Sequence, residues 1–364
     1  DHESARYAQL LVALGLQRGD RVAVQVEKSP AALFFYLGCL RAGLIYVPLN
    51  TAYRDLELEH FLDDAEPALV VCAPERLDAL RVLTAARGIA NVYTLDAAGH
   101  GSLYEAARVC NPRAQVDPVG AGDIAVILYT SGTTGRPKGA MITHGNLASN
   151  ATTLHQAWGF RDGDVLLHAL PIFHIHGLFV ACHTALLNAS SMLFLPKFGA
   201  ASVIAQLPRA SVFMGVPTYY TRLLAEPAFG REACRNMRLF TCGSAPLLPQ
   251  TFLEFRERTG HAILERYGMT ETGMNTSNPL DGARRPGTVG PPLPGVQVRI
   301  VDKQDYDLPA GETGQLLVKG ANVFRGYWRL PEKTAEEFSA DGFFRTGDLA
   351  RRDANGYVSI VGRA

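Results

Sequence analysis

Short apolar runs alternate with amphipathic stretches along most of the chain, and this pattern predicts strands that alternate with helices. In the first part we expect strands at 21–26, 44–47 and 68–72 and helices at 5–14, 30–41 and 56–63. The strand candidates are largely apolar, which is typical of parallel strands whose sheet is covered by helices on both faces. The pattern therefore predicts an α/β fold.

The same alternation continues through the middle of the chain and then stops. Strands are expected at 124–128, 165–169, 191–194, 212–215, 238–242 and 262–266, with helices at 144–158 and 177–187. Beyond residue 284, short strands at 297–301, 314–319 and 357–361 are separated by Pro and Gly, which is typical of a small β-rich subdomain. We therefore expect two α/β subdomains with mostly parallel sheets, 1–160 and 161–285, followed by a β-rich subdomain, 286–364.

Composition narrows the classes of partner. Of the 364 residues, 47 % are apolar, which is enough for a substantial core. Lys and Arg together number 35, as do Asp and Glu, so the net charge is near zero, which argues against a nucleic acid or an anionic membrane as the main partner. None of the six cysteines forms a Cys-x-x-Cys pair and no apolar run is long enough to cross a bilayer, so we expect reduced thiols in a cytoplasmic protein.

The most informative stretch is 129–139, which reads Tyr-Thr-Ser-Gly-Thr-Thr-Gly-Arg-Pro-Lys-Gly and follows an apolar run. Backbone N–H groups, hydroxyls and an ammonium gathered in one loop suit a phosphate. The loop is not a Walker A motif, because Pro137 stands where that motif needs its last glycine and Gly139 where it needs a hydroxyl. The candidate phosphate-binding residues are Thr130, Ser131, Gly132, Thr133, Thr134, Gly135 and Lys138.

Three further segments carry chemistry that suits a nucleotide. The first consists of Glu265, Arg266, Tyr267, Gly268, Met269, Thr270 and Glu271. In it, Tyr267 can stack on an adenine ring, Thr270 can donate to a phosphate and Glu271 can hold Mg²⁺. The second, Gly243, Ser244, Ala245 and Pro246, follows the strand expected at 238–242, and open α/β sheets bind ligands at such strand ends. In the third, Asp348 ends a Thr-Gly-Asp sequence and can accept both hydroxyls of a ribose.

These segments resemble, in order, the motifs of the AMP-forming adenylating enzymes, the superfamily of acyl-CoA synthetases, luciferases and peptide-synthetase adenylation domains. The resemblance implies the large N-terminal domain of the adenylate-forming fold, with ATP or AMP, Mg²⁺ and coenzyme A as cofactors. Lys138, Thr270 and Glu271 would be catalytic, and residues 243–246 would line the adenine and acyl pockets. The resemblance also implies that Arg363 contacts the ribose beside a hinge, and that 326–328 and 331–334 are architecture.

The acyl pocket is expected around two histidines and an arginine. The resemblance implies a gate between the acyl and pantetheine tunnels, with His174 as the first and catalytic choice and His176 as the second. Ser244 and Met274 are further substrate candidates. A second carboxylate in such a pocket needs a cation, best an arginine. Since the surrounding run resembles malonate-activating members of the superfamily, we expect Arg284 to bind the free carboxylate of malonate, with Arg285 as the second choice.

Alternative functions stay open. The acid could be methylmalonate or a short monocarboxylate, or a fatty or aryl acid, which an apolar residue at position 284 would have supported. An amino-acid-activating domain would favour an Asp where His174 stands. A nucleotide-binding module without chemistry is the non-enzymatic alternative. Superfamily members continue past a Gly-Arg pair such as 362–363 into a C-terminal domain with a catalytic lysine. We expect that domain to be absent here, so that the chain binds small molecules, and no nucleic acid or membrane, but is weak at chemistry.

Overall fold

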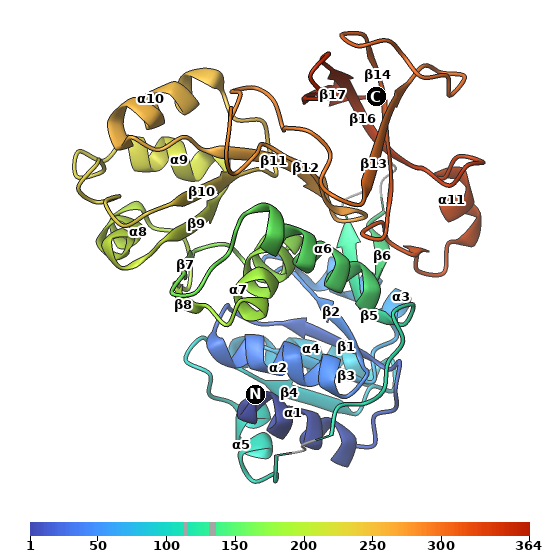
Figure 1. Cartoon of the computed structure of the whole chain (residues 1–364). Helices are drawn as coiled ribbons and strands as arrows, with labels where there is room; N and C mark the ends of the chain where they lie inside the picture. The colour runs from blue at the N-terminus through green and yellow to red at the C-terminus, as the bar shows by residue number, and fades with distance from the viewer. Residues whose placement is uncertain (113–114, 131–135) are drawn as a thin grey trace. The chain divides into compact units, whose positions relative to one another are not determined.

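The computed structural model describes residues 1–112, 115–130 and 136–364 (Figure 1). These residues divide into two compact units. Unit 1 consists of Asp1–His144 with Ile172–His174, and unit 2 of Gly145–Pro171 with Ile175–Ala364. Within the described ranges, no helix is both long enough and apolar enough to cross a membrane.

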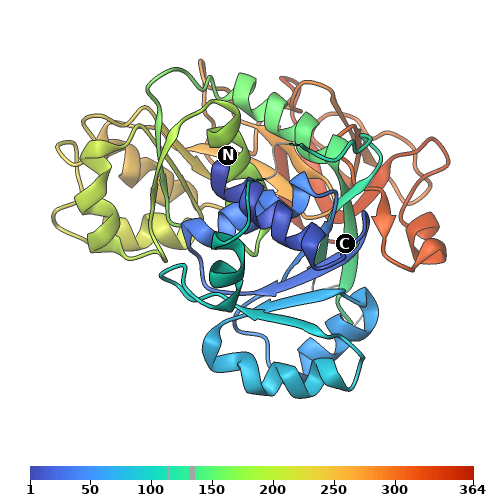
Figure 2. The ribbon, with the colours of Figure 1, turned by 90° about the horizontal axis from the view of Figure 1, so that it is seen from below.

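Unit 1 is built on a mostly parallel sheet with the strand order β6-β5-β2-β1-β3-β4. Its strands are β1 (Arg21–Gln25), β2 (Ile45–Pro48), β3 (Leu69–Cys72), β4 (Asn91–Thr94), β5 (Ile124–Thr130) and β6 (Lys138–Thr143). Its helices are α1 (His2–Ala13), α2 (Pro30–Arg41), α3 (Asp55–Ala65), the short 3₁₀ segment η1 (Pro74–Arg76), α4 (Leu77–Ala85) and α5 (Ser102–Arg108). Helices α1 and α2 cover one face of the sheet, and α3 and α4 cover the other (Figure 2). Burial on both faces explains why β2 and β3 are apolar throughout.

Unit 2 contains a second, largely parallel sheet with the order β12-β11-β10-β9-β7-β8. Its strands are β7 (Val165–His168), β8 (Ser191–Phe194), β9 (Val212–Gly215), β10 (Leu239–Cys242), β11 (Leu264–Met269) and β12 (Gly273–Ser277). Along the strands of this sheet, successive residues point to opposite faces and pack into two different hydrophobic cores. Leu167 and Phe213 pack with residues of α8 (Ala200–Gln206), α9 (Pro217–Leu224) and α10 (Pro249–Thr259). Leu166 and Val212 pack against α6 (His144–Ala157), the π-helix η2 (His176–His183) and α7 (Thr184–Leu187). The short 3₁₀ segment η3 (Leu207–Arg209) follows α8.

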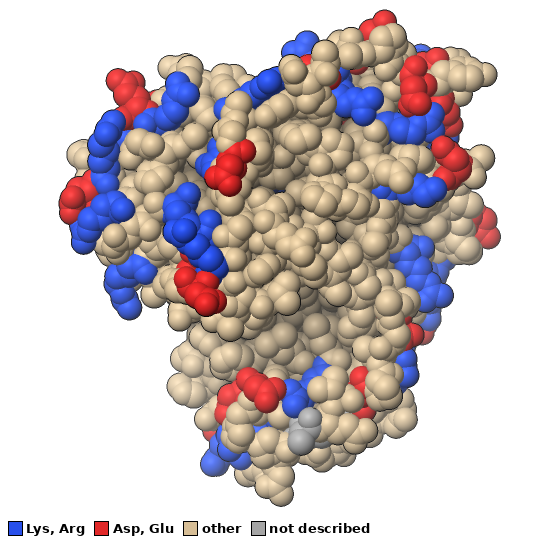
Figure 3. Space-filling model, in the orientation of Figure 1, with Lys and Arg blue, Asp and Glu red and all other residues tan. Residues whose placement is uncertain are grey.

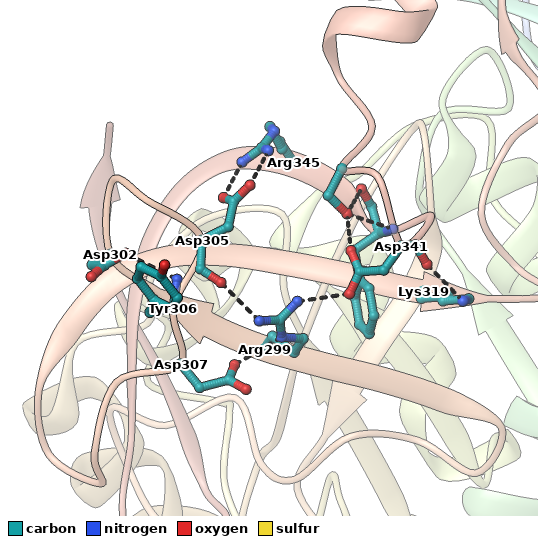
Figure 4. A network of polar contacts seen from close by, with 10 residues as sticks. Arg299, Asp302, Asp305, Tyr306, Asp307, Lys319, Asp341 and Arg345 are labelled. Atoms are coloured by element: carbon teal, nitrogen blue, oxygen red, sulfur yellow. Dashed lines mark hydrogen bonds and ion pairs between the residues drawn. The ribbon is translucent and has the colours of Figure 1, made fainter.

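The third sheet, also in unit 2, is antiparallel with the order β13-β14-β16-β17. It consists of β13 (Val296–Val301), β14 (Thr313–Gly320), β16 (Phe344–Arg352) and β17 (Val358–Arg363), while β15 (Gly326–Tyr327) and α11 (Pro331–Glu336) lie between β14 and β16 along the chain. Its loops are fastened by ion pairs: Arg299 bonds Asp307 and Asp341, and Arg345 bonds Asp305 (Figure 4). The predicted α/β fold with a small β-rich part is confirmed. The predicted boundaries at 160 and 285 remain predictions.

Two of the differences from the sequence prediction lie close to the candidate site residues of unit 2. The helix predicted at 177–187 begins as a π-helix at His176, where an added Cβ on Gly177 would lie 2.0 Å from the carbonyl oxygen of Pro171. His168 also bonds the Gly177 carbonyl through Nε2 at 2.8 Å. Strand β12 is not among the predicted strands, and its Asn275 is of a type that strands disfavour. It pairs with β11, and Asn150 bonds both backbone groups of Met274 within it.

Charges of both signs are interspersed on the face of the molecule that Figure 3 shows. The equal numbers of acidic and basic residues in the chain agree with this distribution. Small groups of mixed charge give little long-range attraction for a polyanion, so binding of an anion on this face depends on local groups.

Candidate active site

Thr270 and Glu271 lie at the tip of a β-hairpin in unit 2. Strands β11 and β12 pair antiparallel, with a bulge between Tyr267 and Gly268. A Cβ on Gly268 would lie 2.1 Å from the carbonyl oxygen of Gly273, and Gly273 has a φ of +59°. Only glycine tolerates that approach and that backbone angle at low cost. The two glycines therefore let the hairpin turn tightly and present Thr270 and Glu271.

Three asparagine side chains, one of them in β12 itself, hold this hairpin. Asn322 donates from Nδ2 to the carbonyl of Thr272 at 2.6 Å, and Asn275 donates from Nδ2 to the Thr272 hydroxyl at 2.7 Å. Asn150, on α6, accepts from the N–H of Met274 at 3.2 Å and donates to its carbonyl at 3.1 Å. These bonds to Thr272 and Met274 restrict movement on the β12 side of the turn, so residues outside the motif help to position Thr270 and Glu271.

The Glu271 side chain is buried, and its Oε1 accepts from the hydroxyl of Tyr327 at 3.0 Å. Its backbone carbonyl accepts from the N–H of Phe324 at 2.7 Å. Among the described residues, no group of three or more His, Cys, Asp or Glu could hold a metal ion. Mg²⁺ needs no such group, because it commonly binds one or two carboxylates together with phosphate oxygens and water. A single buried carboxylate at a turn therefore fits Mg²⁺ carried by a nucleotide.

The Thr-Gly-Asp sequence forms a bulge in β16, where the pairing with β14 shifts register. The Thr346 hydroxyl donates to the carbonyl of Leu316 at 2.8 Å, which replaces a bond that the bulge removes from the ladder. Gly347 supplies a φ of +71°, and the N–H of Asp348 donates to the Thr346 hydroxyl at 3.1 Å. Each residue of the motif thus has a structural part in directing the Asp348 carboxylate.

Asp348 joins the other predicted nucleotide residues of unit 2. Tyr267 donates its hydroxyl to Oδ2 of Asp348 at 2.5 Å, and Nη1 of Arg363 lies 3.1 Å from Oδ1. Arg363 is also the register partner of Asp348 in the β16–β17 pair. Burial, followed by the charge of Asp348, raises the pKa of Tyr267 well above its usual value, so the phenol stays a donor. This cluster can position the hydroxyls of a ribose.

Arg266, next to Tyr267 in β11, is a buried cation with unused donors. Its side chain is 2 % exposed, and neither Nε nor Nη2 has a hydrogen-bond partner among the described residues. Nε and Nη2 lie on the same edge of the guanidinium, the edge that binds both oxygens of a carboxylate. Gly243 faces the group, since a Cβ there would lie 2.5 Å from Nη1. Burial lowers the pKa of Arg266 to about 10, and the group remains charged near neutral pH.

Glu265 points away from Arg266 in the same strand, as alternation along β11 requires. Its Oε1 accepts from the N–H of Gly287 at 3.2 Å, and its backbone carbonyl accepts from Nδ2 of Asn278 at 3.1 Å. Burial raises the pKa of Glu265 to about 7. Glu265 thus ties β11 to the loop after Arg285 rather than facing the Asp348 cluster.

Arg284, predicted as the partner of a second carboxylate, uses its donors on the backbone. Nε donates to the carbonyl of Pro279 at 3.2 Å, Nη1 to Ala262 at 2.6 Å and Nη2 to Leu280 at 2.8 Å. Arg285 bonds Asp353 at 2.7 Å. The role predicted for Arg284 remains a prediction.

The remaining acyl-pocket candidates differ in how far their side chains are buried. His176 is buried, and its Nδ1 lies 3.4 Å from the hydroxyl of Ser244, which has a φ of +68°. His174 is exposed, and Met274 is buried in the core beside α6. Residues Ala245 and Pro246 are exposed next to Ser244. His176 therefore faces Ser244, another predicted substrate residue.

In unit 1, the structure describes the two ends of the glycine-rich loop. Thr130 and Lys138 are register partners in the β5–β6 pair. Helix α3 supports both ends: Asp64 accepts from the hydroxyl of Tyr129 at 2.6 Å, and Nε2 of His60 lies 3.2 Å from the carbonyl oxygen of Pro137. The predicted phosphate-binding residues Ser131, Gly132, Thr133, Thr134 and Gly135 lie outside the described residues.

Sequence reasoning missed several residues that support the site. Asn150, Asn275, Asn322 and Tyr327 all contact the Thr270–Thr272 turn, directly or through its neighbours. Asn275, an asparagine in an otherwise strand-like stretch, was the available signal, because a buried amide needs partners.

Comparisons with known proteins agree with this geometry. Residues 1–328 match the family model described as AMP-binding enzyme. The chain is 37 % identical to a malonate–CoA ligase of Arabidopsis thaliana over 96 % of this chain and 60 % of that protein. It superposes on the crystal structure of ATP-bound MatB from Rhodopseudomonas palustris with a TM-score of 0.97 and 55 % identity, covering 100 % of this chain and 72 % of the other. A malonyl-CoA ligase in a ternary product complex with methylmalonyl-CoA and AMP matches with a TM-score of 0.83 and 37 % identity, over 100 % and 75 % of the two chains.

Proposed function

This chain belongs to the family of AMP-binding enzymes, and we propose that it is the nucleotide- and acid-binding part of a malonate–CoA ligase. The chain spans about 60 % of the length of the curated relatives that it matches, so the activity is proposed for the whole protein. In that reaction malonate and ATP give malonyl-AMP and pyrophosphate, and CoA then displaces AMP to give malonyl-CoA. The names of the similar proteins, several of which are malonate–CoA ligases, support the proposal.

The observation that carries the choice of a diacid is the buried guanidinium of Arg266. A charge removed from water without a partner is costly, and buried donors without acceptors are rare in native proteins. Nε and Nη2 have no partner among the described residues and are closed to solvent, so a ligand carboxylate could accept from both once the groups that cover them move. One carboxylate of malonate reacts with the nucleotide, so the other is available for Arg266. A monocarboxylate has no group for this purpose.

The chemistry assigned to the other residues is positioning and charge neutralisation. The reacting carboxylate oxygen attacks the α-phosphorus, the bond to the bridging oxygen breaks, and pyrophosphate leaves with the electron pair. Mg²⁺, held by Glu271, supplies neutralisation of phosphate charge when it is bound. Thr270 donates to a phosphate oxygen, and Asp348, oriented by Tyr267, accepts from the ribose. Thr130 and Lys138 of unit 1 remain the proposed phosphate-binding residues.

We also propose a cytoplasmic location, which the six free cysteines support. Coenzyme A, ATP and the acid are then the partners of the protein. Methylmalonate is the closest competing acid, because it keeps both carboxylates and one similar structure holds its CoA ester.

Pyrophosphate release by the full-length protein tests the proposal. Malonate, methylmalonate, acetate and octanoate are compared at equal ATP and Mg²⁺, with and without CoA. The proposal predicts that malonate gives the highest kcat/KM and that both diacids exceed both monocarboxylates. A preference for acetate or octanoate would exclude a diacid site, and no pyrophosphate release with any acid would exclude adenylation of these substrates.

A further inference from the structure

Tyr327 belongs to a segment that the sequence assigned to architecture, yet its hydroxyl contacts the carboxylate proposed to hold Mg²⁺. Its side chain is 4 % exposed, and the hydroxyl donates to Oε1 of Glu271 at 3.0 Å. The two residues are 56 positions apart, so the contact depends on the fold and not on a local motif.

The backbone of Tyr327 is fixed by Thr334. The N–H of Tyr327 donates to the Thr334 hydroxyl at 2.9 Å, and that hydroxyl donates to the carbonyl of Leu330 at 2.8 Å. Gly326, with a φ of +136°, lets Thr334 approach, because a Cβ there would lie 2.5 Å from Cγ2 of Thr334. Gly326 and Thr334 together therefore position the backbone of Tyr327 and, through it, the ring.

The ring of Tyr327 is in turn held by Phe324. Their centroids lie 4.9 Å apart at an interplanar angle of 74°, an edge-to-face contact that restricts both rings. Phe324 also donates its backbone N–H to the carbonyl of Glu271 at 2.7 Å. One residue thus fixes the backbone of Glu271 and the ring whose hydroxyl reaches the Glu271 side chain.

We propose that Tyr327 is a positioning residue for the metal site, because its hydroxyl fixes the rotation of the Glu271 carboxylate and so decides which oxygen serves the cation. The inference rests on the proposed binding of Mg²⁺ and nucleotide. A hydroxyl donor to one oxygen of a buried carboxylate removes rotational freedom about the last side-chain bond. Partners of this kind typically change metal affinity or activity by about 10–100-fold when they are removed.

The test is Mn²⁺ binding to the full-length protein by electron paramagnetic resonance, with ATP present and no acid, so that no reaction occurs. Tyr327→Phe removes only the hydroxyl and should weaken Mn²⁺ binding in the ATP complex by about 10–100-fold. Binding of AMP in EDTA, measured by calorimetry, should change by less than about twofold, since that complex needs no metal site. Tyr357→Phe is the matched control, because its hydroxyl bonds the carbonyl of Ala283 at 2.8 Å and should leave both affinities unchanged.

A double-mutant cycle with Glu271→Gln gives the sharper result. If Tyr327 acts through Glu271, Tyr327→Phe should cause little further loss of Mn²⁺ affinity in the Glu271→Gln protein. Equal losses in AMP and Mn²⁺ binding, or an unchanged Mn²⁺ affinity, would overturn the positioning role. Thr334→Val keeps the hydroxyl of Tyr327 and removes the acceptor for its N–H. It should therefore give a smaller loss of Mn²⁺ affinity with unchanged AMP binding. This variant tests the positioning role if Tyr327→Phe does not fold.

The wild-type measurements distinguish a failure of the proposed function from a failure of the role of Tyr327. A wild-type protein that binds neither AMP nor Mn²⁺–ATP would overturn the proposed function, and this inference with it. A wild-type protein that binds both, with a Tyr327→Phe variant that binds both equally well, would overturn only the role of Tyr327.

Discussion

Replacing Arg266 by Met should make the protein more stable and at the same time remove its preference for malonate. The substitution keeps most of the side-chain volume and deletes a buried guanidinium whose Nε and Nη2 have no partner among the described residues. Each unsatisfied buried donor costs roughly 1–3 kcal/mol, so the ligand-free variant should unfold at a higher temperature. Stability and activity then change in opposite directions, as they often do at sites built to bind a ligand.

The loss of activity follows from the bonds that the carboxylate would lose. Two charge-assisted hydrogen bonds are worth roughly 1.5–3 kcal/mol each, and truncation also leaves the free carboxylate of malonate buried without a partner. A loss of about 3–5 kcal/mol corresponds to about 10²–10³-fold or more in kcat/KM for malonate. Butyrate has no second carboxylate, so its kcat/KM should change by less than about threefold or increase.

Arg284→Met is the matched comparison and should behave in the opposite way. It leaves the carbonyls of Pro279, Ala262 and Leu280 without their donor, so the melting temperature should fall. The ratio of kcat/KM for malonate to that for butyrate should stay unchanged. Melting curves and both kcat/KM values for the two variants in the full-length protein decide the matter. A selective loss of malonate activity in Arg284→Met, with an unchanged ratio in Arg266→Met, would restore Arg284 as the diacid residue.

Other predictions concern the nucleotide, pH, the hairpin and the length of the chain. Asp348→Ala should weaken AMP binding by roughly 1–3 kcal/mol, and Tyr267→Phe by less, as measured by calorimetry; unchanged affinity in both would exclude the ribose role. The pKa of Glu265 is raised to about 7 from 4.5, so its contribution to stability is present below about pH 4.5 and is lost as the pH rises through about 7. Between pH 4.5 and 8, the free energy of unfolding of Glu265→Gln should therefore rise by on the order of 3 kcal/mol relative to that of wild type, as measured with denaturant. Parallel pH profiles of the two proteins would contradict this. Gly268→Ala should abolish pyrophosphate release, because its Cβ would lie 2.1 Å from the Gly273 carbonyl oxygen, and it should reduce AMP binding less. The 364-residue chain should bind AMP but form acyl-adenylate far more slowly than the full-length protein, since it spans about 60 % of its curated relatives, and equal rates would refute this.

The sequence predicted the layered fold and the nucleotide motifs because both depend on local patterns. Apolar runs identify buried parallel strands, and motifs such as Thr-Gly-Asp name residues whose chemistry can be read directly. The bond between Tyr267 and Asp348 spans 81 positions, and no local pattern predicts it. The same limit applies to Tyr327 and Asn322, whose partners lie far away in the sequence.

The arginines illustrate a different limit. The sequence places Arg284 before a Pro-Gly pair and Arg266 inside a strand, and both are equally able to bind a carboxylate. The arginine that keeps unused donors is decided by where the backbone carbonyls lie. Three of them accept from Arg284, whereas Nε and Nη2 of Arg266 have no partner among the described residues. The π-helix at His176 depends likewise on the approach of the Pro171 carbonyl to Gly177, which apolar periodicity does not encode.

The hydrogen bonds around the hairpin turn also bear on how this region opens. Phe324 donates its amide to the carbonyl of Glu271, and Asn322 bonds the carbonyl of Thr272, so the segment after β14 cannot detach while the turn stays closed. Amides that share such bonds exchange with solvent through a common local unfolding event. The Phe324 amide should therefore exchange at the same rate as its neighbours in the turn, although some fifty residues separate them along the chain. Bound AMP should suppress this local unfolding and so slow hydrogen exchange in both segments together.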